Sequence, residues 1–137
     1  MAANNQGAEE LMYMQQLYEQ QYRSLSEAIT SNSNELRELS AVQKAIEESA
    51  LLENRELFTH VGSGFYVRSK AMDAKTFTVG IGGGYLEEMS ADYAKEYIAR
   101  LIEKKSAELT AAISNRKKVE SSLLEVIHRL DAAAGSR

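Results

Sequence analysis

A run of glycines at residues 80–84, in the stretch VGIGGGYLEE, could do chemistry because glycine-rich loops bind phosphate. A dinucleotide-binding fingerprint needs Gly-x-Gly-x-x-Gly between a strand and a helix, and Tyr85 stands where the third glycine is required. The earlier pair, Gly62 and Gly64, fails in the same way at Val67, and no lysine follows for a P-loop. We therefore interpret the glycines as turn residues. A nucleotide-binding enzyme stays an alternative, which titration calorimetry with ATP and NAD would exclude by giving no heat.

Side chains that perform acid–base or metal chemistry are few. The chain has no cysteine and two histidines, His60 and His128, which we expect to be structural or exposed. The glutamate pairs at 47–48 and 87–88 are adjacent in sequence and diverge, so they make a poor acid–base pair. The sequence predicts no catalytic residue, no metal site and no cofactor, and thus no enzyme.

Length and charge narrow the class of protein further. With 137 residues the chain fits one domain, and its net charge of −4 disfavours nucleic acid as a partner. We interpret the basic run at 116–118 as a solvated helix face. No apolar run approaches the roughly 20 residues of a membrane span, and residues 1–10 lack the apolar stretch of a signal peptide. We expect a cytoplasmic protein without a membrane partner.

Long helices are predicted on both sides of the glycine-rich segment, and they must hold that segment in place. The chain has no proline, and glycine is missing between Ala8 and Val61 and again between Tyr85 and Ala134. A heptad pattern predicts a helix of roughly 70 Å over about 8–54. Its seam is Leu11, Gln15, Tyr18, Tyr22, Leu25, Ile29, Asn32, Leu36, Leu39, Gln43, Ile46 and Ala50. The polar members Gln15, Asn32 and Gln43 either fix the register of pairing or lie at the edge of the stripe.

A second heptad pattern over about 91–131 follows Ser90, a good N-cap residue. Its seam is Ile98, Ile102, Lys105, Leu109, Ala112, Arg116, Val119, Leu123, Val126 and Leu130. A helix with an exposed apolar stripe is unstable alone, and the two segments have similar lengths. We predict that they pair as an antiparallel coiled coil, with both termini at one end.

The middle of the chain predicts two β-hairpins with glycine turns. The motif VGSGFYV at 61–67 resembles VGIGGGYL at 79–86, an offset of 18 residues, and alternating apolar residues flank both. Four short strands have open edges and too little apolar mass for their own core. We therefore expect them to join hairpins of other subunits through Val61, Phe65, Val67, Phe77, Val79, Ile81, Tyr85 and Leu86.

A long helix, two hairpins with a Val-Gly-x-Gly turn and a long returning helix resemble the alpha-type subunit of prefoldin, a molecular chaperone, of the archaeal kind. The segment VGSGFYVRSKAMDAKTFTVGIGGGYLEE carries most of the resemblance. It implies one prefoldin-like domain over 1–137, with helical arms at 8–55 and 90–132 and a double hairpin at 56–88. The fold class is mainly α with a small β insert, whose hairpins assemble into an intersubunit β-barrel platform.

The resemblance also implies a function and partners. Two alpha-type and four beta-type subunits would form a hexamer that holds unfolded clients at the coiled-coil tips without ATP and delivers them to a cytosolic group II chaperonin. Four consecutive large apolar residues, 11–14, cannot all face one seam, because successive helical residues differ by about 100°. The expected tip set is Leu11, Met12, Tyr13, Met14, Leu17, Leu123, Leu124, Val126, Ile127 and Leu130. The alternative is a coiled-coil adaptor that binds one folded partner.

Overall fold

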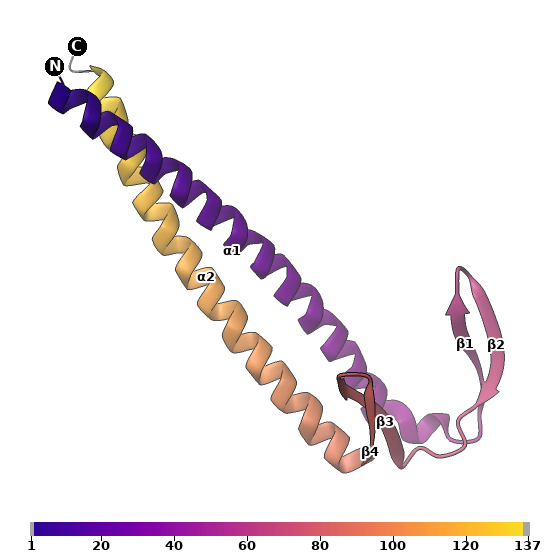
Figure 1. Cartoon of the computed structure of the whole chain (residues 1–137). Helices are drawn as coiled ribbons and strands as arrows, with labels where there is room; N and C mark the ends of the chain where they lie inside the picture. The colour runs from indigo at the N-terminus through magenta and orange to yellow at the C-terminus, as the bar shows by residue number, and fades with distance from the viewer. Residues whose placement is uncertain (1, 136–137) are drawn as a thin grey trace. The chain divides into compact units, whose positions relative to one another are not determined.

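The computed structural model describes residues 2–135, in which one long helix precedes two β-hairpins along the chain and a second long helix follows them (Figure 1). The elements in chain order are α1 (Ala2–Glu48), the 3₁₀ helix η1 (Ser49–Leu52), β1 (Glu56–Gly62), β2 (Phe65–Lys70), β3 (Thr76–Gly82), β4 (Tyr85–Ser90) and α2 (Ala91–Gly135). This confirms the predicted fold class. The first helix ends earlier than the expected arm, because η1 and Asn54, with φ of 63°, lead the chain into β1.

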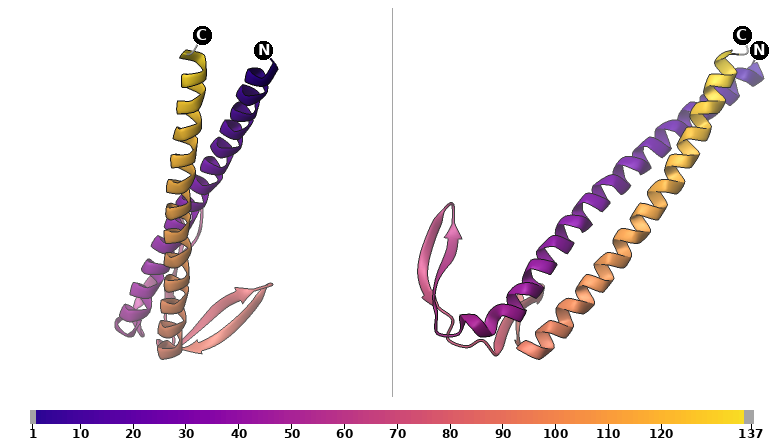
Figure 2. Two further views of the ribbon diagram at one scale, coloured as in Figure 1. Left: turned by 90° about the vertical axis from the view of Figure 1, so that its left-hand side faces the viewer. Right: turned by 180° about the vertical axis from the view of Figure 1, so that it is seen from behind.

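Two compact units divide the chain, and each is described by itself. Unit 1 comprises α1 up to Glu35 and α2 from Lys105, and unit 2 comprises residues 36–104 with both hairpins. In unit 1 the two helical segments lie side by side and run antiparallel, so their outer ends lie at the same end of the pair (Figure 2). The predicted antiparallel pairing is therefore confirmed.

The predicted seam is the shielded stripe of both helices. Each described seam residue is partly or fully buried, and Ile46, Ile98, Ala112 and Val126 are the most buried. The polar seam residue Gln15 donates its side-chain amide to Glu19 on the same helix, so it does not select the partner helix. Heptad spacing thus places the apolar stripe correctly, because burial on a helix follows the 3.6-residue period.

The two hairpins share one turn geometry. Ser63-Gly64 and Gly83-Gly84 form the two-residue loops, and all four have positive φ, as a type I′ turn requires. Register shifts precede both turns, between His60 and Gly62 and between Gly80 and Gly82.

The predicted offset of 18 residues between the hairpins is wrong. Gly62 pairs with Phe65 as Gly82 pairs with Tyr85, so the structural repeat is 20 residues. Matching Val61 to Val79 would have put Ile81 in the turn, and a β-branched side chain resists positive φ. The turn therefore moves on to two glycines, and Val61 corresponds to Ile81.

The second hairpin, β3–β4, packs against the helices of unit 2. Met89 on β4 is 3% exposed and shares a cluster with Ile46, Ala94 and Ile98, against which Phe77 and Val79 of β3 also pack. At the last residue of β4, the Ser90 hydroxyl accepts a hydrogen bond from the backbone N–H of Tyr93 at 3.1 Å. This confirms the predicted N-cap and fixes the junction between β4 and α2.

Candidate functional site

Five large apolar side chains among the described residues of unit 1 face solvent, and one of them, Ile113, is 36% exposed and lies further in along α2. The other four lie towards the outer ends of the helices, and we call them the end surface: Met12, Tyr13, Leu17 and Leu124. Their exposed fractions are 53%, 68%, 41% and 60%. Monomeric proteins seldom leave contiguous large apolar side chains in water without a binding role. Met12 and Tyr13 are adjacent on α1, whereas their neighbours Leu11 and Met14 turn towards the seam and are partly shielded.

The register of unit 1 brings the two helices' contributions together. Arg116 donates a hydrogen bond to the Ser26 hydroxyl at 3.4 Å, and its guanidinium lies 5.7 Å from the ring centroid of Tyr22. Because the helices are antiparallel, we can count the same number of residues outward from Ser26 along α1 and from Arg116 along α2. This count places Leu17 near the level of Leu124. The end surface therefore has members from both helices.

The other expected tip residues on α2 line the seam. Val126 is 4% exposed, so a client cannot touch it while the helices are paired. Leu123, Ile127 and Leu130 are partly shielded. These side chains pack between the paired helices, so of the ten expected tip residues only Met12, Tyr13, Leu17 and Leu124 are exposed.

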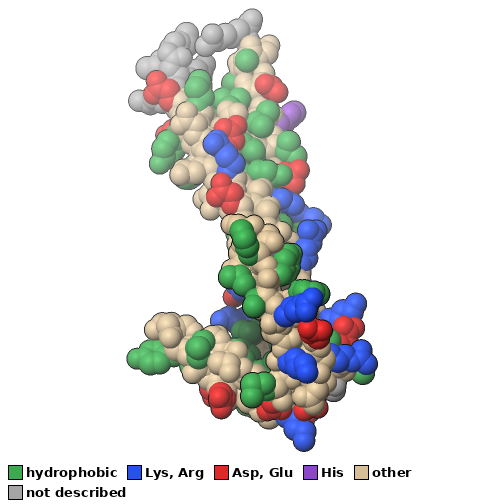
Figure 3. Space-filling model, turned by 90° about the vertical axis from the view of Figure 1, so that its right-hand side faces the viewer, with side chains coloured by type: hydrophobic (Ala, Val, Ile, Leu, Met, Phe, Trp, Pro, Cys, Tyr) green, Lys and Arg blue, Asp and Glu red, His purple; other side chains and the backbone are tan. Residues whose placement is uncertain are grey.

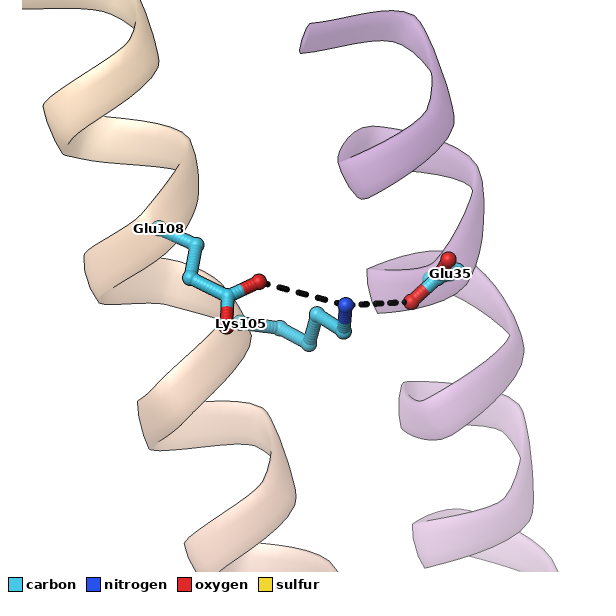
Figure 4. Close-up of polar contacts among 3 residues, drawn as sticks. All are labelled: Glu35, Lys105 and Glu108. Atoms are coloured by element: carbon cyan, nitrogen blue, oxygen red, sulfur yellow. Dashed lines mark hydrogen bonds and ion pairs between the residues drawn. The ribbon is translucent and has the colours of Figure 1, made fainter. Parts of the chain in front are cut away.

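A charged bridge ties the two helices at the inner limit of unit 1 (Figure 4). The Lys105 ammonium lies 2.8 Å from a Glu35 carboxylate oxygen across the pair and 3.2 Å from Glu108 on its own helix. Glu35 first, and then Glu108, raise the pKa of Lys105 above its ordinary value by accepting hydrogen bonds from the charged form. The long basic seam residue thus keeps its charge partnered at the edge of the stripe.

The first hairpin, β1–β2, exposes apolar side chains on both faces. Side chains of cross-strand partners lie on the same face of a hairpin. Val67 therefore shares one face with its partner Thr59, whereas Phe58, His60 and Tyr66 lie on the other face. Large exposed residues of this hairpin are Phe58, Val61, Phe65, Tyr66 and Val67. Sequence reasoning missed Phe58 and Tyr66, although their alternation with Leu57 and Val67 marks them as the second face.

The expected assembly residues of the second hairpin separate into two groups. Phe77 and Val79 pack inside unit 2, whereas Ile81, Tyr85 and Leu86 are exposed near the turn. Because Phe77 and Val79 are already partnered within the chain, they support the hairpin rather than offer a free surface.

Residues that could do chemistry remain dispersed. Over residues 2–135 no group of three or more His, Asp or Glu side chains could hold a metal ion. His60 and His128 are both exposed, and the His60 ring packs 5.2 Å from that of Tyr66. Within the same described range, neither long helix carries a stretch apolar enough to cross a bilayer.

The fold defines a class of protein in which two long antiparallel helices are joined by two β-hairpins and expose apolar side chains near the helix ends. A family model described as "Prefoldin subunit" matches residues 11–134. Prefoldin subunit alpha 1 of Thermococcus kodakarensis is 30% identical over 103 residues, which cover 74% of this chain and 70% of that relative. Prefoldin subunit alpha of Pyrococcus horikoshii is 27% identical over 136 residues, covering 98% and 87%. The chain therefore belongs to the prefoldin family of chaperones, as an alpha-type subunit.

A solved structure shares the fold. The cryo-electron-microscopy structure of filamentous PFD from Methanocaldococcus jannaschii has a TM-score of 0.59 and 19% identity to this chain. The match covers 89% of this chain and 96% of that one. At this identity the likeness supports the arrangement of helices and hairpins, and nothing about partners.

Proposed function

We propose that this chain is a subunit of an ATP-independent holdase, which captures unfolded proteins on the end surface of unit 1. The observation that carries the proposal is the exposure of Met12, Tyr13, Leu17 and Leu124 where the antiparallel pair ends. Unfolded chains expose apolar side chains, and burying them yields roughly 25 cal/mol per Å². Methionine is flexible and polarizable, so it adapts to apolar partners of varied shape.

Assembly with other subunits brings several such surfaces together, each of which binds weakly alone. The exposed side chains of the first hairpin give it no core within its own chain, which supports our proposal that it joins other subunits in a β-barrel platform. We propose two alpha-type and four beta-type subunits, in the cytoplasm, with a group II chaperonin receiving the client. Several end surfaces held together bind one unfolded chain far more tightly than one surface does.

The test is suppression of aggregation of a chemically denatured enzyme by the complex assembled with beta-type subunits, without nucleotide. We expect the double change Met12→Ser and Tyr13→Ser to weaken suppression about threefold or more, since central apolar anchors dominate binding. Val42→Ser, at a 46% exposed position of α1 in unit 2, is the matched control and leaves suppression unchanged.

Two results would overturn the proposal. One is aggregation that proceeds unchanged beside the intact wild-type complex. The other is a pull-down that recovers a single folded protein in fixed ratio and no unfolded ones, which is the behaviour of a coiled-coil adaptor. Native mass spectrometry of each variant confirms that the complex remains assembled.

A further inference from the structure

We propose that the end surface of unit 1 prefers unfolded segments in which apolar residues are interspersed with lysine or arginine. This inference rests on the proposed holdase function and names the class of client that it fits. The apolar side chains form the docking surface, and the charges around them set the preference.

The two helix ends carry a net negative charge. Residues 7–22 of α1 carry three glutamates and no lysine or arginine. Residues 119–135 of α2 carry three carboxylates and one arginine, Arg129, which forms an ion pair with Glu125 at 2.8 Å. With six carboxylates against one guanidinium, these two segments hold a net charge of −5, although the whole chain has only −4.

Helical spacing puts carboxylates beside the apolar side chains. Glu9 lies four residues before Tyr13, and Glu10 lies three residues before it, so both flank the same part of α1. On α2, Glu120 lies four residues before Leu124. In the space-filling view, acidic and hydrophobic side chains are interspersed at this end of unit 1 (Figure 3).

These carboxylates are available to a client. Glu9, Glu10, Glu120 and Asp131 are exposed, and the ion pairs formed among residues 2–135 involve none of them. Apart from Arg129, the basic side chains of unit 1 nearest to the end surface among residues 7–135 are Arg23 and those of residues 116–118, which lie further in along both helices.

Complementary charge selects among apolar segments of similar size. A lysine or arginine next to a client's apolar residue can approach Glu9, Glu10 or Glu120 while the apolar part is buried. Like charges facing one another weaken binding, so acidic segments and nucleic acid are disfavoured. Exposed pairs contribute about 0.2–1 kcal/mol each, so three of them produce a preference of about tenfold.

The experiment measures binding of the full chain in its native assembly to three fluorescent peptides by anisotropy. The peptides share one apolar sequence and carry interspersed lysine, serine or glutamate. At low salt we expect the lysine peptide to bind about tenfold more tightly than the glutamate peptide, with the serine peptide between them. At about 1 M salt, where the Debye length is about 3 Å, the difference should largely disappear.

A double variant assigns the preference to the end surface. Glu9→Gln with Glu10→Gln should reduce the lysine-over-glutamate ratio about fivefold, because it removes two of the three comparable pairs that produce the tenfold preference. Glu47→Gln with Glu48→Gln, an adjacent exposed pair on the same helix in unit 2, is the matched control and leaves the ratio unchanged.

The failures of the two proposals are distinguishable. Equal binding of all three peptides overturns the charge preference and leaves the holdase function standing. Failure of every peptide to bind contradicts the holdase function itself. A lysine peptide without apolar residues that binds as tightly as the apolar lysine peptide also overturns the inference, since the apolar surface then has no part in it.

Discussion

Removal of the Met89 side chain tests whether the second hairpin is held by the helices of unit 2. Met89 is 3% exposed and packs with Ile46, Ala94 and Ile98, so Met89→Ala leaves a cavity between β4 and both helices. Large-to-small changes of this kind cost about 2–5 kcal/mol. Because the cluster is small and no described side chain of the chain falls below 2% exposure, we expect the lower end, about 2–3 kcal/mol.

The assay is unfolding in urea followed by circular dichroism, at one fixed protein concentration because assembly adds to apparent stability. The matched control is Met72→Ala, the same chemical change at a side chain that is 92% exposed, which should alter the free energy of unfolding by less than about 0.5 kcal/mol. Equal losses at the two positions, or no loss at Met89, would refute the claim that this hairpin is anchored by its own chain.

Three further changes probe the turns, the cap and the charged bridge. Gly64→Ala places a Cβ at φ of 82° and should lower the free energy of unfolding in urea by about 1–2 kcal/mol. Gly7→Ala within α1 should instead raise it by about 0.5–1 kcal/mol. A change of the same sign for both variants would contradict the turn assignment. Ser90→Ala should cost about 1 kcal/mol by the same assay, while Ser90→Asp should retain most of the cap. Lys105→Gln should lower stability at neutral pH, because the raised pKa of Lys105 means that its contribution is complete below pH 10.5 and is lost as pH rises through the folded-state value. A wild-type advantage that persists far above that pH, in unfolding measured across alkaline buffers, would assign the effect to packing instead.

The pairing and the buried stripe of the helices could be predicted from the sequence, although the end of the first helix could not. Heptad spacing locates the seam because helical burial repeats with the turn of the helix, and this local rule needs no knowledge of the partner. Four successive apolar residues at 11–14 likewise predict that some must face water, and the exposed ones are Met12 and Tyr13.

The hairpins could be predicted in kind but not in detail. The sequence match aligned Val61 with Val79, whereas turn strain at Ile81 shifts the second turn onto Gly83-Gly84. Burial was also out of reach, because Val61 and Ile81 stay exposed while Val79 packs inward. Strand alternation identifies the two faces of a ribbon, but only the neighbouring helices decide which face is covered.

The same asymmetry between the hairpins bears on how the chain must be produced. The second hairpin packs against the helices of its own chain. The first hairpin is solvent-exposed on both faces, so Phe58, Phe65 and Tyr66 can contact any apolar surface. A copy made in excess of its companions therefore carries an adhesive patch that dilution does not remove. We therefore expect a copy whose first hairpin stays uncovered to associate with other apolar surfaces.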